Sequence, residues 1–227
     1  TLLILGVFKK NSSALVYNLS IVALLILLAL IFNLTSANES YLFNQSYKID
    51  ALSTFMKMLT VASGILVMFS SSKYLKFIKI FKIEYPILLL SAILGMMVMI
   101  SSNDLIVFYL GLEIQAMSLY VLASFNRENI FSTESGVKFF VLSALSSGLL
   151  LYGCSLIYGF SGSTNFNSIS ANNLFDAKYG ITFGIVFILV GLSFKISAVP
   201  FHMWAPDVYQ GSPTSVTLFF AILPKIA

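Results

Sequence analysis

The sequence has few charged residues, one cysteine and one histidine. Only 10% of its 227 residues are charged, whereas soluble domains carry roughly 25%. The single cysteine, Cys154, excludes an intramolecular disulfide and cannot by itself hold an iron–sulfur cluster or a structural zinc ion. There is also one histidine, so a haem or metal site made of two histidines from this chain is excluded.

Long apolar runs take the place of these residues. Hydrophobic side chains make up 58% of the sequence, and runs of about 18 or more can cross a bilayer as helices. The net charge of +4 does not indicate nucleic-acid binding, because the lysines are confined to short segments between the runs. We therefore predict an all-α membrane protein, a polytopic helical bundle with about seven or eight membrane segments. They are expected at 1–8 (the end of a first span), 14–32, 53–72, 85–102, 104–125, 136–160, 180–199 with an irregular continuation to about 210, and from 214 onward.

The two ends of the sequence favour a piece of a longer protein or of a split subunit. Residue 1 is Thr rather than Met, and the run 1–8 is too short to span a bilayer. The last residues, 219–227, lie within an apolar run. We expect the chain to be incomplete at both ends.

Basic residues are unevenly distributed over the segments between spans, and this predicts the orientation. The richer side is expected to face the cytoplasm or the mitochondrial matrix. The segment 73–82 on that side has a lysine at every third position, which is typical of an interfacial connector that anchors topology; a specific lipid or partner site is the alternative. The richer side carries Lys9, Lys10, Lys73, Lys76, Lys79, Lys82 and Arg127, and the poorer side carries Lys48, Lys57 and Lys178.

Three ionisable residues, Glu113, Lys195 and Lys225, lie inside apolar runs. A charge within a membrane span is costly, so it usually faces the protein interior and marks an ion or proton pathway. At 1.5 Å per residue, all three are expected near the middle of a hydrocarbon core about 30 Å thick. A row of groups at one depth favours proton transfer along the membrane plane.

Two of these charges lie beside prolines. Pro200 is expected to break its helix at Ile196, next to Lys195, and Pro224 to do the same one turn before Lys225. Helix interruptions at membrane depth are tolerated where protein or water satisfies the backbone, and transporters use them at ion sites.

Each candidate residue also has a simpler structural explanation. Lys195 and Lys225 can extend to the interface, and Glu113 can be a static partner that only fixes packing. His202 can be an interfacial hydrogen-bonding residue, and Lys138 can form a surface pair with Glu134, four residues before it. Asp104, by contrast, is expected to cap the start of its helix.

Three segments resemble a known family of membrane proteins. The run 111–122 (GLEIQAMSLYVL) resembles the glutamate-bearing helix of the antiporter-like subunits of respiratory complex I, the NADH:ubiquinone oxidoreductase. The run 194–214 (FKISAVPFHMWAPDVYQGSPT) is similar to the broken seventh helix and following loop of one branch, subunit 2, which is called subunit N in bacteria. The run 131–160 is similar to the sixth helix of that branch. The resemblance covers nearly the whole chain.

The resemblance implies a fold of fourteen helices, in which two inverted five-helix repeats follow three leading helices. This chain would hold the leading helices over 1–84 and the first repeat of the antiporter-like proton channel over 85–227. The proline-broken helix would belong to that repeat, and the lysine of the second repeat is absent.

The same resemblance assigns roles to individual residues. Glu113 would be the acid of the first half-channel, Lys195 the lysine with which it pairs, and Lys225 the lysine that leads towards the centre. Lys138 and His202 fall on positions that the family uses in its polar axis.

The function implied is that of a proton-translocating membrane-arm subunit of NADH:ubiquinone oxidoreductase. No electron carrier is readable in the sequence, so NADH, FMN, iron–sulfur clusters and ubiquinone are expected on other subunits and no cofactor in this chain. The expected partners are other membrane-arm subunits, including neighbouring antiporter-like subunits, and lipids, without nucleic acid.

Two other functions stay open. The first is a cation/proton antiporter or membrane-hydrogenase subunit of the same superfamily, and the second is an inactive structural scaffold. The location expected is the mitochondrial inner membrane, because the Phe-, Ile-, Asn- and Ser-rich usage suggests an AT-rich genome. The bacterial plasma membrane is the alternative.

Overall fold

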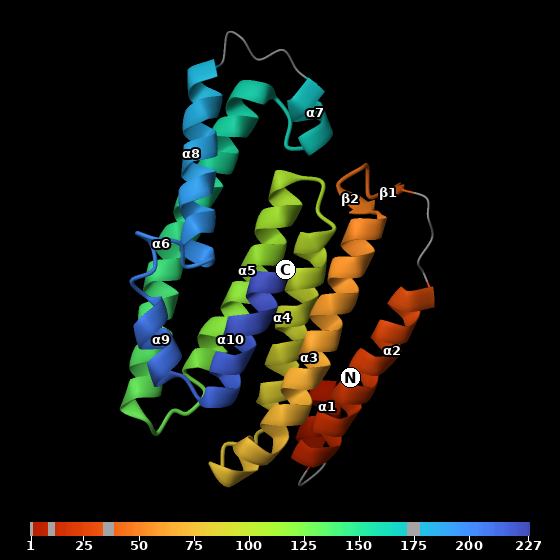
Figure 1. The fold of residues 1–227 in the computed structure, drawn as a ribbon, viewed down its shortest axis with the longest axis vertical. Coiled ribbons are helices and arrows are strands. Elements are labelled where there is room, and N and C mark those ends of the chain that lie inside the picture. Colours follow the sequence, from red (N-terminus) through yellow and green to blue (C-terminus); the bar gives the residue numbers. More distant parts are fainter. Residues whose placement is uncertain (1, 9–11, 34–38, 172–177) are drawn as a thin grey trace.

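The computed structural model describes residues 2–8, 12–33, 39–171 and 178–227, and shows a bundle of helices with one short hairpin (Figure 1). The predicted all-α architecture is confirmed. The elements are α1 (Leu2–Phe8), α2 (Ser13–Asn33), β1 (Ser40–Leu42), β2 (Tyr47–Ile49), α3 (Ala51–Phe77), α4 (Glu84–Ile100), α5 (Leu105–Ala123), α6 (Ile130–Ser161), α7 (Phe166–Ala171), α8 (Lys178–Lys195), α9 (Ala205–Gly211) and α10 (Thr214–Ile226).

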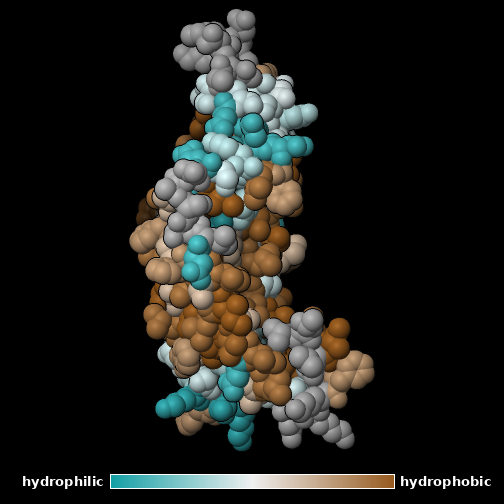
Figure 2. Space-filling view, turned by 90° about the vertical axis from the view of Figure 1, so that its right-hand side faces the viewer, coloured by the Kyte–Doolittle hydropathy of each residue, from teal (hydrophilic) through white to brown (hydrophobic). Residues whose placement is uncertain are grey.

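The helices carry the length and apolar composition of membrane spans. Four of them, α2, α3, α5 and α6, are long and apolar enough to cross a membrane, and α4, α8 and α10 are shorter apolar helices. Figure 2 shows a broad hydrophobic band between more hydrophilic ends. Many large apolar side chains of the long helices are exposed, for example Leu66 and Leu145, which is the arrangement expected of a surface that faces lipid.

Small residues allow neighbouring helices to pack closely. A Cβ atom added at Gly111 of α5 would lie 2.7 Å from the backbone nitrogen of Met99, on α4. A Cβ at Gly153 of α6 would lie 2.7 Å from the Gly184 carbonyl oxygen, on α8. Close backbone approach through glycine is a usual device of membrane helix pairs, and it fixes α5 and α6, the helices that carry the site.

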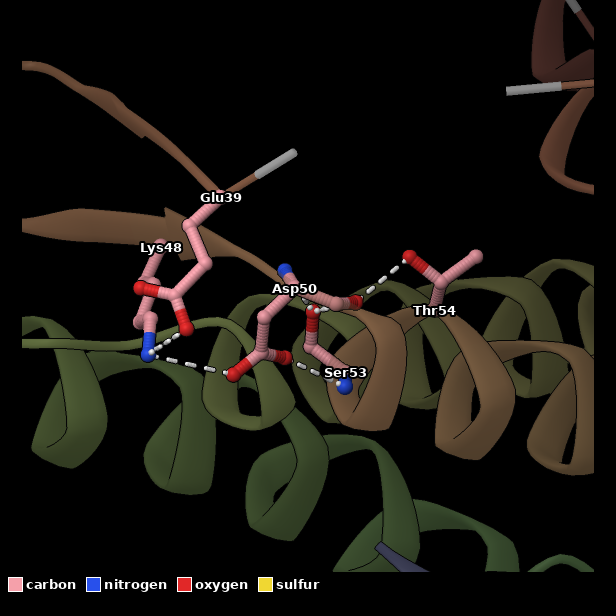
Figure 3. Close-up of polar contacts among 5 residues, drawn as sticks. All are labelled: Glu39, Lys48, Asp50, Ser53 and Thr54. Atoms are coloured by element: carbon pink, nitrogen blue, oxygen red, sulfur yellow. Dashed lines mark hydrogen bonds and ion pairs between the residues drawn. The ribbon is translucent and has the colours of Figure 1, made fainter. Parts of the chain in front are cut away.

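The polar segment that precedes α3 contains the β1–β2 hairpin. Its strands pair antiparallel, with Ser40 opposite Ile49. Lys48 forms ion pairs with Glu39 (3.2 Å) and Asp50 (3.3 Å), as Figure 3 shows. Asp50 also caps α3, because its side chain accepts from the Ser53 amide at 2.7 Å and the Ser53 hydroxyl accepts from the Asp50 amide at 2.9 Å.

The two ends of the bundle differ as the basic residues predicted. The turns that carry Lys73 to Lys82 and Arg127 lie at the lower end in Figure 1, and the hairpin with Lys48 lies at the upper end. Lys57, near the start of α3, is only 8% exposed and donates to the Tyr47 hydroxyl at 2.9 Å. Lys9 and Lys10 lie outside the described residues.

The break after α8 lies where the sequence predicted, and the backbone closes the helix before Pro200 is reached. The helix ends at Lys195, and Ser197 follows with a left-handed φ of 59°. The Ala198 amide donates to the Ser193 carbonyl (2.8 Å) and the Ser197 amide to the Phe194 carbonyl (3.1 Å), which is a Schellman ending.

The second predicted break was wrong, because α10 continues through Pro224 to Ile226. Proline removes one amide and crowds one carbonyl, and the helix accommodates the single lost hydrogen bond at Pro224. Lys225 therefore lies on a helix.

Candidate functional site

The site is built around Lys195, the last residue of α8. Its ammonium lies 3.8 Å from Oε1 of Glu113, which comes from the middle of α5. The two side chains are only 14% and 21% exposed. The predicted pairing of Glu113 with Lys195 is thus present as an ion pair between two helices that are far apart in sequence.

Helix α6 supplies the hydrogen bonds that the ion pair lacks. Lys195 donates to the hydroxyls of Ser143 at 2.7 Å and Ser147 at 2.9 Å. The Tyr120 hydroxyl, two turns after Glu113 on α5, also donates to Ser143, at 2.7 Å. Glu113 Oε1 is buried and accepts no hydrogen bond from the described residues. The ammonium is therefore held by serine hydroxyls, whereas Oε1 of the carboxylate meets it only as an ion pair.

Lys225 lies on the same cavity as Lys195. Both line a hollow of about 330 Å³, together with Ser143, Trp204 and Tyr209, and its volume leaves room for several water molecules. The Lys225 ammonium lies 5.8 Å from the centre of the Tyr209 ring, within the range of a cation–π contact. The structure thus places the two lysines on one cavity.

Lys138 lies apart from this cavity, on the half-exposed side of α6. Its ammonium is 2.8 Å from Glu134, four residues earlier, and 2.7 Å from Asp207 of α9. The pair with Glu134 was foreseen as a surface pair. The contact with Asp207, 69 residues away, was not, and it ties α9 to α6.

His202 is exposed and lies in the segment between α8 and α9. The residue that anchors this segment is instead Trp204, which is 5% exposed, donates to the Phe194 carbonyl at 2.9 Å and stacks on Phe139. The segment that follows Lys195 is therefore fixed against α6 and α8.

Sequence reasoning did not identify the serines or Tyr120. A signal was present, since Ser143, Ser146 and Ser147 recur at helical spacing within an apolar span and share one face. Tyr120 follows Glu113 by seven residues and therefore lies on the same face of α5. Asp104 does cap α5, as predicted, by accepting from the Ile106 amide at 2.8 Å.

Fold and site together define a class of protein: a multi-pass helical membrane protein with an ion pair enclosed between its helices. The family described as "NADH:quinone oxidoreductase/Mrp antiporter, TM" matches residues 102–227. The chain is 68% identical over 226 residues to "NADH-quinone oxidoreductase subunit N" of Pelagibacter ubique (strain HTCC1062), covering 100% of this chain and 48% of that protein. The chain belongs to this NADH:quinone oxidoreductase/Mrp antiporter family.

Solved structures agree with this assignment. A chain of respiratory complex I from Thermus thermophilus with bound aureothin superposes with a TM-score of 0.83 at 30% identity, covering 99% of this chain and 48% of that one. A chain of the Mrp complex from Dietzia sp. DQ12-45-1b has a TM-score of 0.76 at 20% identity, covering 96% of this chain and 43% of that one, and shares the fold. The chain spans about half the length of the curated relatives it matches.

Proposed function

We propose that the chain is part of a proton-translocating membrane-arm subunit of an NADH:quinone oxidoreductase. The observation that carries the proposal is the ion pair between Glu113 and Lys195, enclosed among α5, α6 and α8. The 68% identity to a subunit N supports this complex over a free-standing antiporter. Its partners are then the other membrane-arm subunits, including neighbouring antiporter-like ones, and these other subunits hold the redox cofactors.

The relatives also bear on the location. The matched subunit N comes from a bacterium, and no comparison supports the mitochondrial inner membrane that we expected from residue usage. We propose the alternative, the bacterial plasma membrane.

The geometry of the pair suits a reversible switch. At 3.8 Å the attraction between the two charges is about 4 kcal/mol at an effective dielectric of about 20, before the cost of desolvating them. The ammonium and the carboxylate are in ion-pair contact but share no direct hydrogen bond. Protonating Glu113 therefore removes the electrostatic attraction and breaks no hydrogen bond between the two side chains. Lys195 then loses its counter-charge and can release a proton into the cavity that it shares with Lys225. Lysine can release a proton when buried, and arginine cannot.

Two substitutions in the assembled complex test this function. Glu113→Gln keeps the shape of the side chain and removes its titration, so proteoliposomes should translocate fewer protons per NADH oxidised. Lys195→Arg keeps the charge and should reduce the ratio as well. Glu39→Gln, at the exposed hairpin, is the matched control and should leave the ratio unchanged. A wild-type ratio in a fully assembled Glu113→Gln complex would refute the proposal.

A further inference from the structure

The basic end of the bundle contains a hollow that the proton path does not use. It lies among α1, α4 and α5, has a volume of about 330 Å³, and is lined by Leu3, Lys82, Glu84, Leu88, Val121 and Arg127. A second hollow of about 820 Å³ adjoins it and shares Lys82, Phe125 and Arg127 with it. Lys79 also lines this second hollow. We refer to the two together as the basic hollow.

The cations of the basic hollow have no partner among the described residues. Lys79, Lys82 and Arg127 are exposed, and no carboxylate in the described part of the chain lies within the 4 Å of an ion pair from any of them. Of the two acids on its walls, Glu84 lies in the first turn of α4, where a carboxylate complements the helix dipole. The other acid is Glu128. Three cations and two carboxylates therefore line the basic hollow, and none of the cations is in ion-pair contact with either carboxylate.

The position of each wall along the helices matches the order of groups in a phospholipid. Lys82 lies two residues before α4 begins and Arg127 lies four residues after α5 ends, so both are at the water interface. Leu88 and Val121 lie on the membrane side, roughly 6 Å and 3 Å inside the two helix ends. The basic hollow is thus cationic at the interface and apolar towards the hydrocarbon.

The backbone at Lys79 supplies an independent observation. Helix α3 closes with a Schellman ending, in which the Ile80 amide donates to Leu75 and the Lys79 amide donates to Lys76. Lys79 takes the left-handed position, with a φ of 61°, where glycine is favoured. The side chain at this turn is a cation that lines the basic hollow, and local backbone geometry does not explain its presence.

We propose that the basic hollow binds one anionic phospholipid of the leaflet at this end. Lys82 and Arg127 contact its phosphate, Lys79 adds a further positive charge, and one acyl chain lies along Leu88 and Val121. Arginine and lysine near the membrane surface attract anionic headgroups. A zwitterionic lipid would bring its own ammonium to walls on which cations outnumber carboxylates, and free phosphate has no apolar part to fill the membrane side.

Photolabelling of the assembled complex in nanodiscs tests this site. The probe is phosphatidylglycerol with a diazirine on one acyl chain, at trace level in phosphatidylcholine, and the labelled peptides are mapped by mass spectrometry. Label is expected on the start of α4 and the end of α5. Lys82→Gln and Arg127→Gln should each reduce it about fivefold, and the double variant roughly 30-fold, as expected for cations near an anionic surface.

Two further variants separate the site from general surface charge and from misfolding. Lys73→Gln removes a charge from the same end, outside the walls of the hollow, and should change labelling by less than about twofold. Lys79→Gly removes a charge while relieving the left-handed backbone, so it should lower labelling at unchanged thermal stability. The proposal is overturned by equal labelling with a phosphatidylcholine probe, by a Lys73→Gln effect as large as that of Lys82→Gln, or by label found only on other subunits.

Discussion

Lys195 illustrates how one ionisable side chain is held inside an apolar bundle. Two serine hydroxyls lie closer to it than the carboxylate does, at 2.7 and 2.9 Å against 3.8 Å. Ser143 is the central residue, since it accepts from both Lys195 and Tyr120. A hydroxyl has two acceptor lone pairs, so these two bonds occupy both.

Replacing Ser143 by alanine should therefore impair the site more than removing a neighbouring serine. A hydrogen bond to a charged group is worth about 1.5–3 kcal/mol, and Tyr120 would also lose its acceptor. We expect Ser143→Ala to lower proton translocation per NADH oxidised in proteoliposomes.

Ser146→Ala is the matched control for this change. Ser146 is buried on the same helix and donates to the Gly191 carbonyl at 3.3 Å, away from Lys195. Equal losses in the two variants would show that the serines act through helix packing and not through the ammonium.

At the scale of elements, the crossing of α4 and α5 places Glu113. Gly95 and Gly111 face each other there, and each approaches the backbone of the opposite helix. A larger side chain on either would push the helices apart, and Glu113 lies only two residues beyond Gly111. The small residues thus position the carboxylate as well as the helices.

Gly111→Ala should destabilise the protein by about 1–3 kcal/mol, the usual cost of overpacking. Its Cβ would lie 2.7 Å from a backbone nitrogen, which cannot turn aside as a side chain can. Gly148→Ala on α6 is the control, because nothing lies within 4 Å of its Cβ position. Thermal melting of the purified complex compares the two, and a Gly111→Ala melting temperature equal to that of Gly148→Ala would contradict this account.

The stability of the first turn of α3 should depend on pH, because it depends on the protonation of Asp50 and Lys48. The hydrogen bond from the Ser53 amide is the main reason why the pKa of Asp50 is below its ordinary value of 3.8. The folded state therefore gains stability from the ionised carboxylate above about pH 4, and loses it as the pH falls through the lowered pKa. The hydrogen bond to Glu39 raises the pKa of Lys48 above its ordinary value of 10.5. The stability that protonated Lys48 contributes to the folded state is therefore complete below that ordinary value and is lost as the pH rises through the raised pKa.

Hydrogen exchange in the first turn of α3 measures this dependence. Protection of the Ser53 and Thr54 amides, corrected for intrinsic exchange, should fall on acidification in the wild type. Asp50→Asn keeps a capping oxygen, and in this variant the protection of the two amides should fall less on acidification. Asp50→Ala should lower protection at neutral pH by about 1 kcal/mol, the typical cost of a lost cap. If protection fell as steeply on acidification in Asp50→Asn as in the wild type, the pH dependence would belong to another group.

For the whole molecule, the separation of basic residues predicts one orientation in the membrane. The turns bearing Lys73 to Lys82 and Arg127 share one end of the bundle, opposite the hairpin (Figure 1), and the basic end should face the cytoplasm. The single native thiol, Cys154, is buried and gives little background in cysteine labelling.

An impermeant maleimide should therefore reach Lys76→Cys only in inside-out vesicles. Glu39→Cys, on the hairpin, should react only in right-side-out cells. The reverse pattern would show that the orientation is inverted, and reaction of both positions from one side would contradict the arrangement of the spans.

The sequence by itself predicted the apolar helices, the cap at Asp104 and the charged residues that lie inside apolar runs. It could do so because a bilayer requires apolar runs of a set length and because a cap is a local interaction. Tertiary structure alone decided which groups meet: Lys195 with Ser143, Lys138 with Asp207, Lys225 with Tyr209. Helices that are apolar on every side do not reveal which face turns inward, and close packing at glycines sets that rotation.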